Sequence, residues 1–72
     1  MKKSAYVKQV QQLHEGLHEA AAEMDYSAED IVYDVVQNIK YDYPELVEYL
    51  KGLGVRDVDG RLADDIYSGP VL

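Results

Sequence analysis

The sequence predicts an all-α protein, a small bundle of three to four short helices that forms one domain over residues 1–72. Two observations carry this prediction. Apolar residues recur three and four positions apart along most of the chain, which is the period of an α-helix. Residues that favour helix starts and stops, among them Ser27, Pro44 and Gly69-Pro70, divide the chain into segments with short connections. A chain this short buries a thin core, and dimerisation would be a natural supplement to it.

The first predicted helix covers residues 4–24. Its apolar residues are spaced 4, 3, 4, 3 and 4 positions apart, in the order Tyr6, Val10, Leu13, Leu17, Ala20 and Met24. This spacing places them in one narrow stripe along the helix. We interpret the stripe as the core-facing side of an ordinary helix. The alternative is a seam between two copies of the chain, formed by Tyr6, Val10, Leu13 and Leu17.

The second predicted helix begins at Ser27, where Ser27 and Asp30 resemble a capping box. Tyr26 and Ile31 stand at the positions of a hydrophobic staple. The apolar face consists of Ile31, Val32, Val35, Val36 and Ile39. Its β-branched residues also suit a strand, but the cap signal and the spacing favour a helix.

The third predicted helix begins near Asp42, with Glu45 as its capping partner and Pro44 in the first turn. Its apolar face consists of Leu46, Val47, Leu50 and Leu53, and Gly52 or Gly54 ends it.

The last element has two interpretations. Asp57 or Asp59 can cap a short helix that carries Leu62, Ala63, Ile66 and Tyr67 and stops at Gly69-Pro70. Alternatively, Asp59-Gly60 can form the turn of a small hairpin. We favour the helix.

The charge and the distribution of apolar residues argue against nucleic-acid binding, membrane spans and secretion. The 72 residues hold 14 acidic and 7 basic side chains, a formal net charge of −7, which disfavours direct binding to nucleic acid. A DNA-binding helical module would have to rely on Lys2, Lys3 and Lys8. No apolar run is long enough for a membrane span, and Met1-Lys2-Lys3 is not followed by the apolar stretch of a secretory signal. We therefore expect a cytoplasmic protein.

Two short motifs resemble metal sites. His14-Glu15-Gly16-Leu17-His18 matches the H-E-x-x-H pattern of zincin metalloproteases, whose two histidines bind zinc. The match covers five residues, and the chain has no third histidine. Residues 57–62 resemble part of an EF-hand loop, but Val55 and Ile66 stand where that loop needs ligands. We expect no metal and no cofactor, and retain metal binding by His14 and His18 as an alternative.

No catalytic constellation is present in the sequence. Cysteine is absent, no serine stands in a recognisable nucleophile–base arrangement, and there is no glycine-rich phosphate loop. We therefore expect that the chain is not an enzyme.

The acidic residues of the first helix form the feature that most suggests a function. Glu15, Glu19 and Glu23 recur every four positions, so they form a row of like charge, which we call the acidic row. Each such pair destabilises a helix by about 0.2–0.5 kcal/mol, which suggests a role for a partner. Asp34 on the next helix would extend the negative field. Solubility is the simpler explanation of the charge.

Tyrosine is the second indication of a binding surface. The chain has seven tyrosines and neither Phe nor Trp. Tyr33, Tyr41 and Tyr43 fall outside the predicted apolar faces, and tyrosine is common at protein interfaces. We therefore expect an interaction module that binds the basic surface of another protein as an inhibitor, adaptor or nucleic-acid-mimicking decoy. A structural homo-oligomer held by the first helix is the main alternative.

Overall fold

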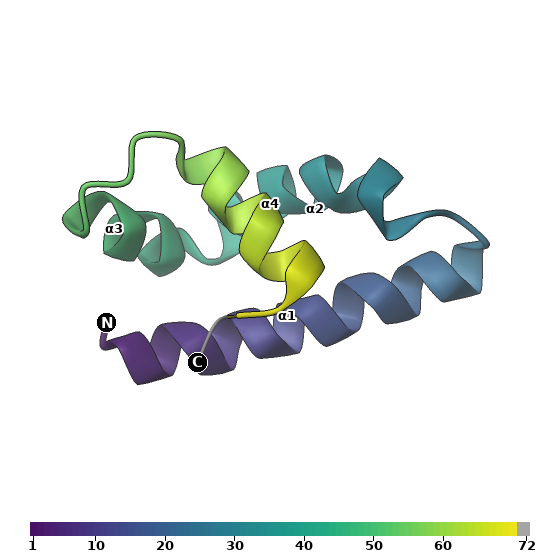
Figure 1. Ribbon diagram of the computed structural model, residues 1–72, viewed down its shortest axis with the longest axis horizontal. Coiled ribbons are helices and arrows are strands. Elements are labelled where there is room, and N and C mark those ends of the chain that lie inside the picture. Colours follow the sequence, from purple (N-terminus) through teal and green to yellow (C-terminus); the bar gives the residue numbers. More distant parts are fainter. Residues whose placement is uncertain (71–72) are drawn as a thin grey trace.

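The computed structural model describes residues 1–70, and within that range it contains four helices and no strand. They are α1 (Lys3–Met24), α2 (Ala28–Asp42), α3 (Pro44–Gly52) and α4 (Val58–Ser68). The all-α prediction is confirmed, and the alternative of a C-terminal hairpin is wrong. α1 lies along one side of the molecule, α2 and α3 lie along the other, and α4 packs against both α1 and α2 (Figure 1).

The core forms along one face of α1, as the spacing predicts, but its far end differs from the prediction. Tyr6, Val10 and Leu17 are buried, and the line continues through Ala21 rather than through Ala20 and Met24. Met24 is 50% exposed. Seven residues of a straight α-helix fall about 20° short of two full turns, so a seven-residue repeat drifts around the helix by that amount per heptad. Over the 22 residues of α1 the buried face therefore moves away from the extrapolated stripe.

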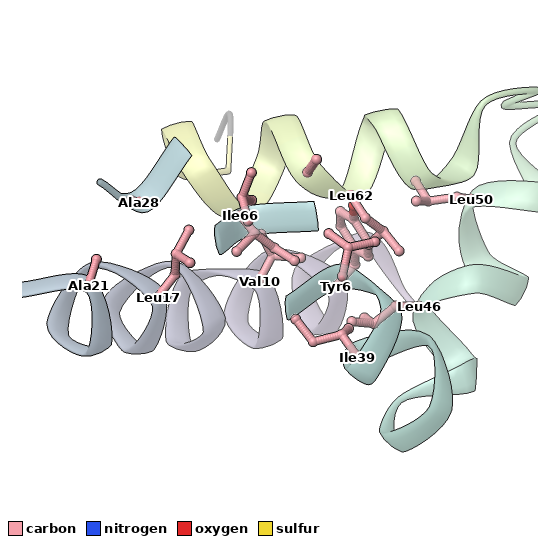
Figure 2. Close-up of a cluster of buried hydrophobic side chains, with 13 residues drawn as sticks. Tyr6, Val10, Leu17, Ala21, Ala28, Ile39, Leu46, Leu50, Leu62 and Ile66 are labelled. Carbon is pink, nitrogen blue, oxygen red and sulfur yellow. The ribbon is translucent and has the colours of Figure 1, made fainter. Parts of the chain in front are cut away.

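The other three helices complete this core with short apolar faces. Figure 2 shows side chains from α1, α3 and α4 meeting in one cluster. The large side chains that are fully buried come from all four helices: Val10 of α1, Val36 of α2, Leu46 and Leu50 of α3, and Leu62 and Ile66 of α4. The buried residues of α2 are Ala28, Val32, Val36 and Ile39. Burial of a side chain of this size contributes about 1.5–3 kcal/mol, so the core depends on a small number of large residues.

The turn from α1 to α2 differs from its predicted chemistry. Asp25 adopts the left-handed conformation at φ 57° and ends α1, and the amide of Tyr26 donates to the carbonyl of Ala21. This pairing is the usual way to close a helix C-terminus. Ser27 is the N-cap of α2 as predicted, but its side chain makes no capping hydrogen bond. Tyr26 is 62% exposed, so the predicted staple with Ile31 does not bury it.

The junction between α2 and α3 is tighter than predicted. Asp42 is the last residue of α2, and Tyr43 is the N-cap of α3, so the predicted cap by Asp42 is wrong. Pro44 occupies the first turn of α3, where its missing N–H costs nothing. At the other end of α3, Gly54 has φ +84° and its amide donates to the carbonyl of Lys51. The positive φ explains the glycine at this position.

Polar contacts position α4 at its start. The amide of Gly60 donates to Oδ1 of Asp57 at 3.0 Å, which confirms Asp57 as the cap. A Cβ atom at position 60 would clash with the Asp57 carboxylate, so glycine there lets the carboxylate keep its capping position. Lys40 pairs with Asp59 at 2.8 Å, and Gln37 donates to the same carboxylate at 3.1 Å. These hydrogen bonds from Lys40 and Gln37 hold the pKa of Asp59 below its usual value.

A second set of polar contacts holds α4 to the start of α1. The hydroxyl of the buried Tyr6 donates to Oδ2 of Asp65 at 2.6 Å, and Nε of Arg61 lies 3.2 Å from the same oxygen. The ring of Tyr6 stacks on Tyr49 of α3 with centroids 4.7 Å apart. Burial of the phenol, together with the hydrogen bond to Asp65, raises the pKa of Tyr6 well above its usual range.

Tyr6→Phe removes only the hydroxyl, so it tests this link between α1 and α4. We expect the free energy of unfolding at pH 7 to fall by about 1 kcal/mol, the usual contribution of one hydrogen bond. Because the pKa of Tyr6 is raised in the folded state, the neutral phenol stabilises the fold below pH ~10, and this contribution declines as the pH rises further. The difference between wild type and variant should therefore shrink above that pH. Urea unfolding of both proteins from pH 7 to 11 measures this difference in free energy of unfolding. A difference that stays constant over this pH range would contradict the role of the Tyr6 hydroxyl.

Candidate functional site

One end of the molecule carries acidic residues without a Lys or Arg, whereas the opposite end carries both cations and acids. No Lys or Arg occurs between residues 9 and 39, whereas seven Asp and Glu residues do. These residues lie in the second half of α1, the turn and the first half of α2, which meet at one end of the molecule (Figure 1). We call this region, residues 15–34, the acidic end.

The cations belong to other segments. The first turns of α1, the end of α3 and the loop into α4 lie at the opposite end, and they carry Lys2, Lys3, Lys8, Lys51 and Arg56 (Figure 1). The other two cations, Lys40 and Arg61, are engaged with Asp59 and Asp65. The charge on the acidic end is therefore not balanced by cations of its own segments.

The acidic row lies on the exposed side of α1. Glu15, Glu19 and Glu23 are all exposed, and Asp34 of α2 is exposed as well. Within residues 1–70, the only hydrogen bond to the row comes from Gln11, whose amide lies 3.2 Å from Glu15. The rise of the helix separates successive carboxylates by about 6 Å along the axis. The row is thus a line of solvated negative charge.

His14 and His18 have a structural task that the sequence did not indicate. Nδ1 of His14 donates to the carbonyl of Ile66, and Nε2 of His18 donates to the carbonyl of Tyr67, each at 2.8 Å. Both carbonyls lie in the last turn of α4, where helix carbonyls lack intrahelical partners. The two imidazoles therefore cap the C-terminus of α4 and hold it on α1.

The residues of the two motifs that resemble metal sites make hydrogen bonds and an ion pair within the fold. One nitrogen of each histidine is occupied by a carbonyl of α4. Among the described residues, no group of three or more His, Cys, Asp or Glu side chains is arranged to hold a metal ion. In the EF-hand-like segment, Asp57 caps α4 and Asp59 pairs with Lys40.

The three tyrosines singled out from the sequence lie in different environments. Tyr41 is 91% exposed, and Tyr33 is 60% exposed. Tyr43 is half-buried and packs against the core, so it does not contribute to an exposed patch. Of the three, Tyr33 lines a concave part of the surface.

That concave region is a hollow of about 370 Å³ between α2 and α4. We call it the tyrosine hollow; it is lined by Glu29, Val32, Tyr33, Ala63, Asp64, Tyr67 and Ser68. Val32 and Ala63 are buried, whereas Tyr33, Tyr67, Glu29 and Asp64 are exposed. The hollow thus combines a buried apolar part with two aromatic rings and two carboxylates.

Sequence reasoning missed the contribution of α4 to this region. In the sequence, Tyr67 stands out only as a residue of the last predicted helix, and no motif or spacing distinguishes Glu29 or Asp64. Asp64 and Tyr67 are three positions apart, so they share one side of α4, but only the packing of α4 on α2 brings that side to Tyr33. The His18 ring lies 5.7 Å from the Tyr67 ring, which links the hollow to α1.

The predicted seam between copies lies inside the folded chain. Tyr6, Val10 and Leu17 are covered by the other helices, and Leu13 is partly buried against the same core. Folding of the chain on itself uses the apolar stripe, so the folded molecule does not offer it to a second copy.

None of the described helices is both long enough and apolar enough to cross a membrane.

Comparison with known proteins gives no relative for this chain: no family model matches it, and no curated protein or solved structure does.

The histidine caps predict a specific loss of stability. His14→Ala removes a half-buried hydrogen bond to the end of α4, and we expect the free energy of unfolding to fall by about 1 kcal/mol. His18→Ala removes a more exposed bond, and its effect should be smaller. Urea unfolding measures both. Gln12→Ala, at an exposed position of the same helix, is the control, and equal stabilities of His14→Ala and Gln12→Ala would show that the cap does not contribute.

Proposed function

We propose that this chain is a small acidic protein-binding module that acts on a partner with a basic surface, as an inhibitor, an adaptor or a nucleic-acid-mimicking decoy. The observation that carries the proposal is the acidic end: seven carboxylates without a Lys or Arg in the same stretch of chain. The acidic row on α1 and Asp34 on α2 are available to a partner because their side chains are exposed.

The placement of the acids along the helices affects helix stability. Carboxylates near the start of a helix, such as Glu29 and Asp30, are stabilised by the helix dipole. In the acidic row, Glu23 lies in the last turn of α1, where the dipole disfavours a carboxylate, and the three carboxylates repel one another along the row. Local stability therefore does not account for the row, whereas attraction to a cationic surface does.

The separation of charge also orients an encounter. A molecule with an acidic end and a cation-bearing opposite end presents one side to a positive surface and turns the other away. Such fields accelerate association and select the docking orientation. The exposed Tyr33 and Tyr67 beside the acids supply contact area with little loss of side-chain entropy.

Neutralising the row tests the proposal. In the variant Glu15→Gln/Glu19→Gln/Glu23→Gln, the three charges are removed and the side-chain shapes are kept. We expect a basic protein that wild type retains from a lysate of the source organism to be lost or strongly reduced with the variant. We also expect wild-type retention to weaken as salt rises, because salt screens exposed charges. Affinity capture at 50 and 300 mM NaCl, read by mass spectrometry, measures both effects.

A matched control separates position from total charge. Asp42→Asn/Glu45→Gln/Glu48→Gln changes the net charge by the same amount at exposed positions outside the acidic end. This control should retain the partner, and circular dichroism should show equal helix content in all three proteins. Retention of the same proteins by wild type and by the acidic-row variant would overturn the proposal.

A further inference from the structure

We infer that the tyrosine hollow is the docking site for an arginine side chain of the partner protein. This inference rests on the proposed function and makes it specific: the acidic end supplies long-range attraction, and the hollow supplies one selective contact. It names a partner surface that presents an arginine, rather than positive charge of any kind.

The lining of the hollow fits the three parts of an arginine side chain. Val32 and Ala63 are buried apolar residues that suit its methylene stem. Tyr33 and Tyr67 offer aromatic faces, on which a guanidinium stacks favourably. Glu29 and Asp64 offer carboxylates, with which the planar guanidinium forms paired hydrogen bonds.

The polar groups of the hollow are available for such a contact. Within residues 1–70, neither Glu29 nor Asp64 takes part in an ion pair or in a side-chain hydrogen bond. The hydrogen bond from His18 uses the backbone carbonyl of Tyr67 and not its hydroxyl, and Tyr67 is 40% exposed. The volume of about 370 Å³ lies near the lower end of small-molecule pockets, about 300–1,000 Å³, which suits a single long side chain.

The position of the hollow supports arginine from a protein partner. It is formed where α2, which carries Glu29 and Asp34, meets the end of α4, and α4 is fixed there by the two histidines of α1. The acids of both helices thus surround an aromatic site, and charge complementarity favours a cationic occupant. Arginine is preferred over lysine because its flat, weakly hydrated group stacks on rings, whereas the ammonium of lysine is compact and strongly hydrated.

The test compares two cationic peptides with the intact chain. Dye-labelled octa-arginine and octa-lysine carry the same charge and differ in the head group. We expect wild type to bind octa-arginine about two- to fivefold more tightly than octa-lysine in 150 mM NaCl, measured by fluorescence anisotropy. Tyr33→Ala and Tyr67→Ala should bring this ratio close to one. Tyr33→Phe keeps the ring and should retain the preference.

Controls separate this inference from the proposed function. Tyr41→Ala removes an exposed tyrosine outside the hollow and should leave the ratio unchanged. The acidic-row variant should weaken binding of both peptides by a similar factor and keep the ratio. A wild-type ratio of one, or a ratio that Tyr33→Ala does not change, would overturn the arginine site while leaving the acidic end intact. Unchanged affinity of the acidic-row variant for both peptides would instead count against the proposed function.

Discussion

The packing of α4 across α1 and α2 is the interaction on which the rest of this structure depends. Its fully buried Leu62 and Ile66 close a core that would otherwise be an open layer of helices. A chain of 72 residues has little apolar surface to spare, so losing one helix from the core would expose a large fraction of it. The same packing brings Tyr67 and Asp64 beside Tyr33, so the core and the tyrosine hollow form together.

Polar contacts hold α4 at both of its ends. At the start, Asp57 caps the helix and Asp59 pairs with Lys40 of α2. At the end, His14 and His18 of α1 satisfy two of its free carbonyls. Because these contacts come from different helices, they fix the direction of α4 as well as its position. The acidic end and the hollow are therefore held in a defined relation to each other.

Much of the fold follows from local rules that the sequence displays. The helical period of the apolar residues predicts the first three helices and favours a helix over a hairpin for the fourth. Pro44 lies in the first turn of α3 as predicted, and Asp57, one of the two candidate caps, caps α4. The errors lie where tertiary packing decides. The buried line of α1 shifts to Ala21, and Tyr43 packs on the core although it falls at a junction. Neither outcome is visible from spacing alone.

The candidate site also contains features that the sequence reveals and features that only tertiary packing creates. The acidic row and Asp34 can be found from their spacing and charge, and the structure leaves them exposed. The tyrosine hollow cannot be found this way, because Tyr33 and Tyr67 are far apart in the chain and meet only through the packing of α4 on α2. The H-E-x-x-H pattern can be found from the sequence, but its role cannot. Its two histidines lie on one face of α1, where they cap the C-terminus of α4.

The central claim is that the acidic end, completed by the end of α4, is the binding face of this molecule. Backbone amide chemical shifts from NMR, recorded during titration with octa-arginine, test it most directly. We expect the chemical-shift changes to concentrate at residues 15–34 and 64–68 and to stay small at residues 2–8 and 51–56. Shifts centred on the cation-bearing end, or spread evenly over the molecule, would contradict it.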